Sequence, residues 1–440
     1  MAIAVKEIIQ PSDRFADLSA EHSWAFSDLK PSDTSYITHG YYTYPAKFIP
    51  QLAARLIKRY SEPGDIVIDP FMGSGTTVVE AMVHGRKAVG VDINHIATLI
   101  AKVKTTPLDE EKLDRACDKL LSLIPRRGDF NYEEQLLKAQ KSIALHPGID
   151  RWFDEHSKNQ LLLIYCHIRR GRDEDLRDFF LVAFAQILKR CSRWAQKSIK
   201  PTVDKNKEGC VPLDLFARQV RKMRKGHAAF GQMLAENGVS PDGEYPKVRK
   251  QDCYDFPCRS GEVSLIVTSP PYVTSYEYAD LHQLPALWFS RSHDLREFRK
   301  EFIGSVQREY LVKGVYSPLA DDIIGSLKAV KGGNGKALAV EHYFADMFTF
   351  FQEARRKLRR GGKMAVVIGN TKLLGVDILN AEVFVEQCKG LGFRFNDVIC
   401  REIPSKMLPS TRDPATGKFA KASASSVLVY PREYILIMER

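Results

Sequence analysis

Short aliphatic runs recur along this chain between polar and turn-forming residues, which is the pattern of buried strands. Three such runs are found at 66–68, 88–91 and 263–267. A glycine-rich turn and an apolar segment of helical length separate the first run from the second, so the order is strand, turn, helix, strand. This order predicts an open α/β sheet whose parallel strands end at a common edge.

A long segment without strand signals separates the second run from the third. From 107 to 246 the apolar residues recur instead at helical spacing, for example in 113–123 and 176–189. A single crossover helix would be enough to connect the two strands. We therefore expect a sheet domain made of residues 1–106 and 247–440, with a large helical insert at 107–246.

The third run leads directly into Thr268-Ser269-Pro270-Pro271-Tyr272. Neither proline can donate a backbone hydrogen bond, and Pro270 also keeps Ser269 out of the helical region. We expect a rigid turn at the carboxyl edge of the sheet, where open α/β proteins bind their ligands. The Ser269 hydroxyl, the Pro270 carbonyl and the Tyr272 ring together suit a planar base that carries an amino group. An ordinary Pro-Pro loop with a packing tyrosine is the alternative.

The first strand ends in the series Asp69-Pro70-Phe71-Met72-Gly73-Ser74-Gly75-Thr76-Thr77. Gly73 and Gly75 allow a tight turn that brings the backbone close to a ligand at the N-terminus of the next helix. The series lacks the Lys-Ser/Thr of a phosphate-binding loop and the third glycine of the dinucleotide pattern. Asp69 suits a cationic ammonium group better than a pyrophosphate. The second strand ends in Asp92-Ile93, at the position where an acid commonly binds a ribose diol.

The glycine turn and the Ser-Pro-Pro-Tyr turn resemble motifs I and IV of the S-adenosylmethionine-dependent DNA amino-methyltransferases, which modify cytosine N4 or adenine N6. Residues 44–50 resemble motif X of this family, and residues 250–253 resemble motif III. The resemblance covers 36–104 and 248–440, with the motifs in linear order. It implies a Rossmann-like class I methyltransferase sheet with a terminal antiparallel hairpin.

The resemblance also implies a set of site residues. The residues expected to bind S-adenosyl-L-methionine are Lys47, Phe48, Asp69, Pro70, Phe71, Gly73, Ser74, Gly75, Thr76, Thr77, Asp92, Ile93, Asp252 and Cys253. The expected catalytic residues are Ser269, Pro270, Pro271 and Tyr272. No metal is expected to take part.

The amino acid in the first position of the catalytic motif bears on the target base. Family members with serine there mostly modify cytosine N4, whereas aspartate more often marks adenine enzymes. We therefore expect methyl transfer to the N4 of a flipped cytosine in duplex DNA. Adenine N6 and an RNA amino group are the alternatives, because a neutral serine at position 269 could accept a hydrogen bond from either amine.

The second half of the insert is strongly basic, since residues 185–230 hold twelve Lys or Arg against three Asp or Glu. We expect it to contact DNA phosphates, although a solvated helix face would have the same composition. The candidate residues are Arg218, Arg221, Lys222, Arg224 and Lys225. A second basic segment at 401–426 contains Lys406 and Arg412 among Pro, Ser, Thr and Gly. It is expected either to order on DNA or to be a disordered surface loop.

Composition agrees with a nucleic-acid enzyme. The net charge of +11 and the pI near 9.1 favour a polyanionic partner, for which we expect double-stranded DNA. A role in restriction-modification would add a cognate restriction endonuclease acting on the same site. The eight cysteines are scattered without zinc-site spacing, and neither a signal peptide nor a membrane-spanning run is evident. We therefore expect a cytoplasmic, nucleoid-associated prokaryotic protein that is a monomer or a homodimer.

Overall fold

A computed structural model describes residues 15–44, 47–198, 201–240, 245–273, 281–289, 300–306, 314–403, 411–412, 427–428 and 432–440. The described chain begins with three short 3-10 helices, at Phe15–Asp17, His22–Trp24 and Ile37–Gly40. Lys406 lies outside the described residues, as does the side chain of Arg412. The Arg412 backbone belongs to β9 (Thr411–Arg412), which pairs with β10 (Val427–Leu428).

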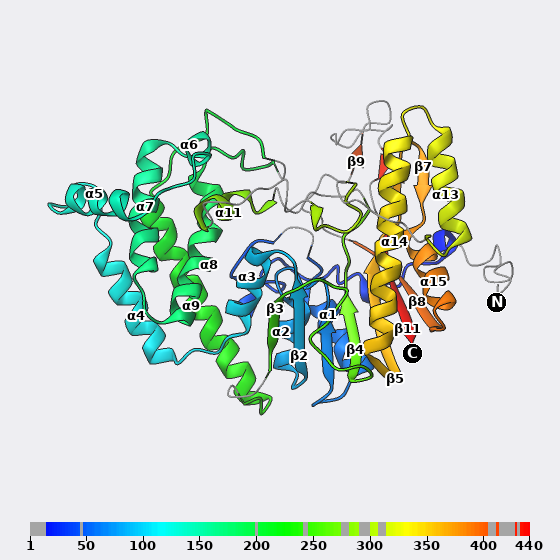
Figure 1. Cartoon of the computed structure of the whole chain (residues 1–440). Helices are drawn as coiled ribbons and strands as arrows, with labels where there is room; N and C mark the ends of the chain where they lie inside the picture. Colours follow the sequence, from blue (N-terminus) through cyan, green and yellow to red (C-terminus); the bar gives the residue numbers. More distant parts are fainter. Residues whose placement is uncertain are drawn as a thin grey trace.

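A seven-stranded sheet forms the centre of the molecule (Figure 1). Its strands are β1 (Ile66–Asp69), β2 (Lys87–Asp92), β3 (Lys247–Lys250), β4 (Val263–Thr268), β5 (Leu358–Ile368), β8 (Arg394–Glu402) and β11 (Arg432–Glu439). They follow the order β3-β2-β1-β4-β5-β11-β8. The first five are parallel to one another, whereas β11 is antiparallel to both of its neighbours. The expected Rossmann-like sheet with a terminal antiparallel pair is confirmed.

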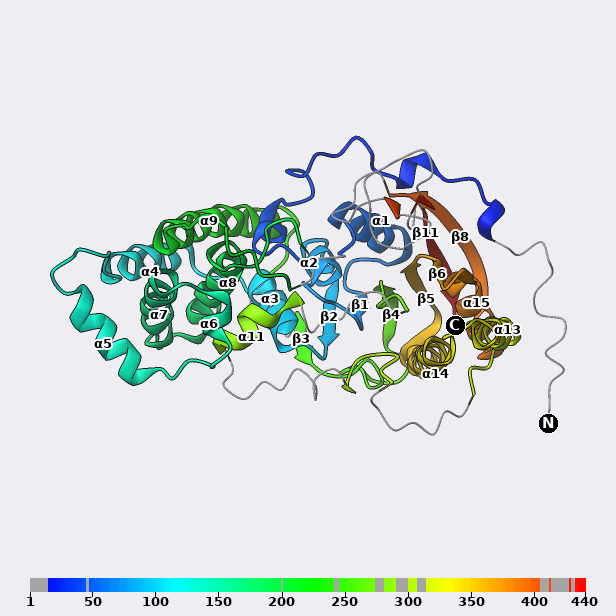
Figure 2. The same cartoon turned by 90° about the horizontal axis from the view of Figure 1, so that it is seen from above.

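Helices cover both faces of this sheet because side chains alternate between the faces along each strand. Val67 and Val267 pack on one face with α1 (Pro50–Tyr60) and α2 (Thr76–Val83). Ile68 and Ile266 pack on the opposite face. The helices on that face are α13 (Pro318–Ala329), α14 (Asn334–Lys357) and α15 (Asn380–Gly390). Figure 2 shows α1 and α14 on opposite sides of the strands.

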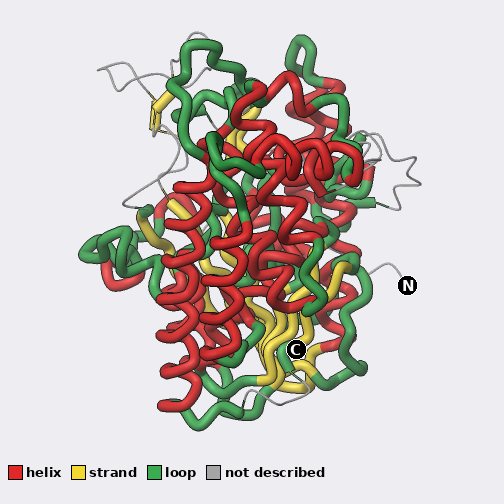
Figure 3. Tube along the Cα trace, turned by 90° about the vertical axis from the view of Figure 1, so that its left-hand side faces the viewer, coloured by secondary structure: helices red, strands yellow, loops and turns green. Residues whose placement is uncertain are grey.

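The segment between β2 and β3 is helical. It contains α3 (His95–Thr105), α4 (Glu110–Leu123), α5 (Tyr132–Ser142), α6 (Ile149–Trp152), α7 (Glu155–Arg169), α8 (Glu174–Cys191) and α9 (Pro212–Glu236). The helices predicted at 113–123 and 176–189 are confirmed within α4 and α8. Figure 3 views the molecule from this side, with the red helices in front of the yellow strands. Ile96 and Ile100 of α3 belong to the same core as these helices, as does Trp288 of α11 (Gln283–Phe289). Phe230 and Leu234 of α9 belong to the core on one face of the sheet, so the helical segment packs on the sheet.

The edge strand β3 carries no hydrophobic signal in the sequence. Its residues Lys247-Val248-Arg249-Lys250 include one aliphatic side chain, and all four are at least partly exposed. An edge strand pairs on one side only and tolerates charged residues, which explains why the pattern of buried runs misses it. The hairpin β6 (Thr371–Leu373) and β7 (Val376–Ile378) follows β5. Among the described residues, no helix has both the length and the apolar character needed to span a membrane.

Candidate active site

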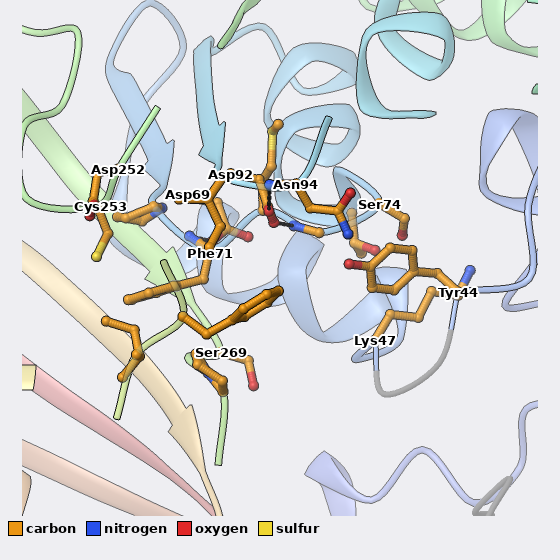
Figure 4. A pocket seen from close by; sticks show the side chains of 18 of the residues that line it. Tyr44, Lys47, Asp69, Phe71, Ser74, Asp92, Asn94, Asp252, Cys253 and Ser269 are labelled. Carbon is orange, nitrogen blue, oxygen red and sulfur yellow. Dashed lines mark hydrogen bonds between the residues drawn. The ribbon is translucent and has the colours of Figure 1, made fainter. Parts of the chain in front are cut away.

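A cavity lies at the carboxyl edge of the sheet, where β1, β2 and β4 end (Figure 4). Asp252 and Cys253 lie at one end of it, and Tyr44 and Lys47 lie at the opposite end. Asp92 lies between these two ends. The parallel strands explain the convergence, because their carboxyl ends bring loops that are distant in sequence to one place.

Asp92, the last residue of β2, is held in the cavity by two backbone amides. The Gly73 amide donates to Oδ2 at 3.0 Å, and the Asn94 amide donates to Oδ1 at 2.8 Å. Burial raises the pKa of the Asp92 carboxyl to about 6, although these two hydrogen bonds act in the opposite direction. Each carboxylate oxygen can accept a further donor, so Asp92 suits a ligand with two adjacent hydroxyl groups.

Asp69 occupies the corresponding position at the end of β1, and only 2% of it is exposed. Its Oδ1 accepts hydrogen bonds from the Phe71 amide at 3.0 Å and from the Thr268 hydroxyl at 2.6 Å. Burial raises the pKa of the Asp69 carboxyl to about 6. A cationic group in the cavity would favour the ionised form of this buried acid.

The glycine turn between β1 and α2 has the predicted backbone conformation. Gly73 and Gly75 have φ values of 48° and 76°, in the left-handed region that favours glycine. A Cβ atom on Gly73 would lie 3.1 Å from the Tyr44 ring, and one on Gly75 would lie 2.8 Å from Cβ of Ala101. The turn is therefore enclosed between the N-terminal segment and α3.

Three polar groups beside the turn are buried without a hydrogen-bond partner in the described part of the chain. They are the Ser74 hydroxyl, the Thr76 hydroxyl and the side-chain amide nitrogen of Asn94. All three residues line the cavity. Buried polar groups in folded proteins are nearly always satisfied, so a ligand with several donors and acceptors fits this surface.

Two lysines support the same end of the cavity. Lys104 is buried beneath the turn, where its Nζ donates to the Ser74 carbonyl at 2.7 Å. Burial, and then the neighbouring charge of Lys47, lower the pKa of the Lys104 amine well below its usual range. The Nζ of Lys47 donates to the His39 carbonyl at 3.2 Å, and burial lowers the pKa of Lys47 to about 8. Lys47 thus lines the cavity, and its amine is bound to a backbone carbonyl that does not line it.

The Ser-Pro-Pro-Tyr turn follows β4 and forms another wall of the cavity. Ser269 and Pro271 line it. The Tyr272 hydroxyl donates to Oε1 of Glu433 on β11 at 2.9 Å, and its ring lies so close to Gly369 that a Cβ there would be 3.1 Å away. The tyrosine is therefore held at its hydroxyl end and along its ring while remaining partly exposed.

The structure brings most of the predicted site residues together. Those that line the cavity are Lys47, Phe48, Asp69, Pro70, Phe71, Gly73, Ser74, Thr76, Asp92, Ile93, Asp252, Cys253, Ser269 and Pro271. Gly75, Thr77, Pro270 and Tyr272 do not line it. Gly75 packs against α3, and Thr77 donates to the Val267 carbonyl at 3.3 Å, which ties α2 to β4.

Sequence reasoning missed several residues of the cavity wall. Tyr44 is the first residue of the segment 44–50 that resembles motif X, but it is absent from the predicted site residues. Asn94 follows the predicted pair Asp92-Ile93, and it caps α3 by accepting from the Ile96 amide. Asn94 could have been found by extending that pair by one residue. The segment 301–303 lies far from every motif in sequence, and it reaches the cavity only through the tertiary fold.

The predicted DNA-binding residues of the helical insert lie along α9, outside the cavity. Arg218, Arg221, Lys222 and Lys225 are exposed there. Arg224 is bound instead by two carboxylates of α4, with Nη2 at 2.6 Å from Asp114 and Nη1 at 3.5 Å from Asp118. The Lys222 side chain lies beside Gly40, where a Cβ atom would be 3.3 Å from its Cε, and its charge, after burial, contributes to the lowered pKa of Lys47.

Comparison with known proteins adds family information to this geometry. A family model described as DNA methylase, for N6 and N4 methyltransferases, matches residues 7–102 and 263–440. The Type II methyltransferase M.MvaI of Kocuria varians is 26% identical over 429 residues, which cover 92% of this chain and 93% of that protein. The Type II methyltransferase M.BsoBI of Geobacillus stearothermophilus is 20% identical over 81% of this chain and 78% of its own length.

A solved structure is also similar to part of the chain. It is that of a putative DNA modification methylase from Thermus thermophilus, complexed with S-adenosyl-L-methionine. The match has 16% identity and a TM-score of 0.20, and it covers 42% of this chain and 50% of that one.

Proposed function

The chain belongs to the DNA methylase family of N6 and N4 amino-methyltransferases, and we propose that its target is the N4 atom of a cytosine flipped out of duplex DNA. Enzymes of this family use S-adenosyl-L-methionine, which supplies an electrophilic methyl group on a sulfonium. The helical segment 107–246 is proposed to hold the DNA beside the sheet edge. A cognate restriction endonuclease would then share the recognition site.

The observation that carries this proposal is the direct link between the two turns. Thr268, the residue before the Ser-Pro-Pro-Tyr turn, donates to Asp69 Oδ1 at 2.6 Å, and Asp69 begins the glycine turn. Ser269 therefore faces the same cavity as Asp69 and Asp92. A group bound by the acids and an amine bound by Ser269 would lie side by side, as methyl transfer requires.

The two ends of the cavity suit the two ends of the cofactor. Asp69 would accept from the ammonium group of its methionine part, and the buried Ser74 and Thr76 hydroxyls would donate to its carboxylate. Asp92 would accept from the two ribose hydroxyls. Asp252 would accept from the adenine amine, on the side of the cavity where Cys253 supplies an apolar wall.

The catalytic turn would act on the target amine through its oxygens. The lone pair of an exocyclic amine is delocalised into the ring, which makes the amine a poor nucleophile. Hydrogen bonds from its two N–H groups to the Ser269 hydroxyl and to the carbonyl of Pro270, which lies between the two lining residues Ser269 and Pro271, would pull the nitrogen toward tetrahedral geometry. As the bond from methyl to sulfur breaks and the bond from methyl to nitrogen forms, the sulfur would leave as a neutral thioether. The same dipoles would stabilise the positive charge that moves to nitrogen, which then loses one proton to solvent. Tyr272, fixed by Glu433, would stack on the flipped base.

Cytosine is proposed over adenine because of the serine at position 269, since family members with serine in this place mostly modify cytosine N4. The test is nucleoside mass spectrometry of DNA incubated with the protein and S-adenosyl-L-methionine. N4-methylcytosine is expected, whereas N6-methyladenine would refute the cytosine assignment and leave the cavity roles intact. Ser269→Ala tests the catalytic role of the serine, because it should reduce turnover more than it weakens DNA binding. Methylation of an RNA duplex in preference to DNA would contradict the proposal.

A further inference from the structure

A second hollow lies on the helical segment and shares no lining residue with the cavity at the sheet edge. It is lined by Arg151, Arg193, Val203 and Lys205. No carboxylate in the described part of the chain lies within ion-pair distance of its three cationic side chains. An anion bound there would therefore meet three cationic side chains that no carboxylate of the described residues pairs with.

Backbone hydrogen bonds hold the three cations in adjacent positions. The Arg193 amide donates to the Trp152 carbonyl at 2.6 Å, which places Arg193 beside the end of α6 and therefore beside Arg151. The Asp204 amide donates to the Arg193 carbonyl at 2.7 Å, which places Lys205 on the other side. Backbone hydrogen bonds therefore bring together the three chain segments that line the hollow, which contain Arg151, Arg193 and Lys205.

Two tryptophans anchor this structure to the hydrophobic core. Trp194 is 3% exposed and stacks on Trp152, with the ring centroids 5.3 Å apart. Its indole nitrogen donates to the Ser198 carbonyl at 3.1 Å. An anchored loop presents its charges without a large ordering cost on binding. The tryptophans therefore position the hollow rather than contact a ligand.

The segment that carries Arg193 and Lys205 is rich in basic residues. Residues 189–207 hold seven Lys or Arg against one Asp. Among the nearby carboxylates, Asp150 pairs with Lys158 at 2.7 Å. Asp154 and Asp204 keep their charges, and each is held by a backbone amide, of Ser157 at 2.8 Å and of Asn206 at 3.0 Å.

We propose that this hollow binds backbone phosphates of the duplex DNA on which the enzyme acts. The inference rests on the proposed function, and it assigns DNA contacts that are separate from the basic run of α9. In Figure 1, α6 lies at the end of the helical segment toward which the carboxyl ends of β2 and β4 point, and β1 runs parallel to both strands. A duplex that presents a base to Ser269 would pass along this side of the molecule. Cations around an apolar residue such as Val203 match the phosphate and sugar of a nucleic-acid backbone.

The test compares two triple variants that lose the same charge. One is Arg151→Gln, Arg193→Gln and Lys205→Gln. The control is Lys119→Gln, Arg127→Gln and Lys141→Gln, three exposed residues elsewhere on the helical segment. Binding to a short random-sequence DNA duplex is measured by fluorescence anisotropy over a series of salt concentrations. The hollow variant should weaken binding and lower the log–log salt slope by about one for each lost phosphate contact. The control should retain most of the wild-type slope.

An unchanged slope in the hollow variant would overturn the proposal, as would an equal loss in both variants. A loss seen with an RNA duplex but not with DNA would also overturn it. Affinity for S-adenosyl-L-methionine should remain at the wild-type value in both variants, which shows that each is folded; the single variant Lys205→Gln provides a milder form of the same test. If the hollow variant behaves as expected but the wild type methylates no DNA, the proposed function fails and the phosphate site stands.

Discussion

At the level of single residues, burial sets the chemistry of the two acids at the sheet edge. The pKa values of Asp69 and Asp92 are both raised to about 6, from an unfolded value of about 4. Between these values the folded protein binds more protons than the unfolded chain. The stability that these groups contribute is therefore present at acid pH and is lost as the pH rises through about 6.

Cofactor affinity should show the opposite trend. S-adenosyl-L-methionine is cationic and favours the ionised acids, so its affinity should rise as the pH increases through about 6. Asp69→Asn should weaken binding by about 1–3 kcal/mol and flatten part of this pH dependence. Isothermal titration calorimetry at a series of pH values would measure both effects, with the exposed Asp322→Asn as control. An affinity that does not change with pH would contradict the assignment of these acids to the cofactor.

At the level of elements, a buried polar cluster joins the N-terminal segment to α2. Glu80 of α2 is fully buried, and its Oε1 accepts from the Tyr36 hydroxyl at 2.5 Å and lies 2.7 Å from Nε2 of His39. Burial lowers the pKa of His39 to about 4, so a neutral imidazole donates this bond at neutral pH. Burial alone would raise the pKa of Glu80, but the hydrogen bonds from His39 and His84 lower it to about 2. Because Lys47 is anchored on the His39 carbonyl, this cluster also positions one wall of the cavity.

Replacing Glu80 by Gln keeps its shape but removes its charge and one acceptor oxygen. We expect Glu80→Gln to lower the free energy of unfolding by about 1–3 kcal/mol, because buried donors lose their partner. Denaturant titration followed by circular dichroism would measure the change, and the exposed Glu133→Gln should leave the midpoint unaltered. A variant as stable as the wild type would show that the cluster contributes nothing to the docking of this segment.

At the level of the whole molecule, the helical segment and the sheet form one packed body with basic residues on the helical side. The ion pairs of Arg224 with α4 separate it from its exposed neighbours on α9. Arg218→Gln, Arg221→Gln and Lys225→Gln together should weaken DNA binding and reduce the salt slope by up to about three. Arg224→Gln, measured in the same anisotropy assay, should change the slope less than any of these and lower stability more. If the triple variant leaves the salt slope unaltered, the basic run of α9 is a solvated helix face.

The sequence alone was sufficient to predict the elements of this protein that depend on local backbone conformation. Gly73 and Gly75 adopt the left-handed conformations that their turn requires, and the aliphatic runs became the central strands. The acids and the serine that follow these strands were therefore predictable as neighbours, because parallel strands end at one edge.

Only the tertiary structure decided the contacts that depend on distant segments. Tyr272 is held by Glu433, which lies 161 positions later in the chain, and the segment 301–303 enters the cavity without any local signal. The hollow at Arg151, Arg193 and Lys205 likewise exists because a loop folds back onto α6. Such contacts arise from packing and long-range hydrogen bonds, which no short stretch of sequence specifies on its own.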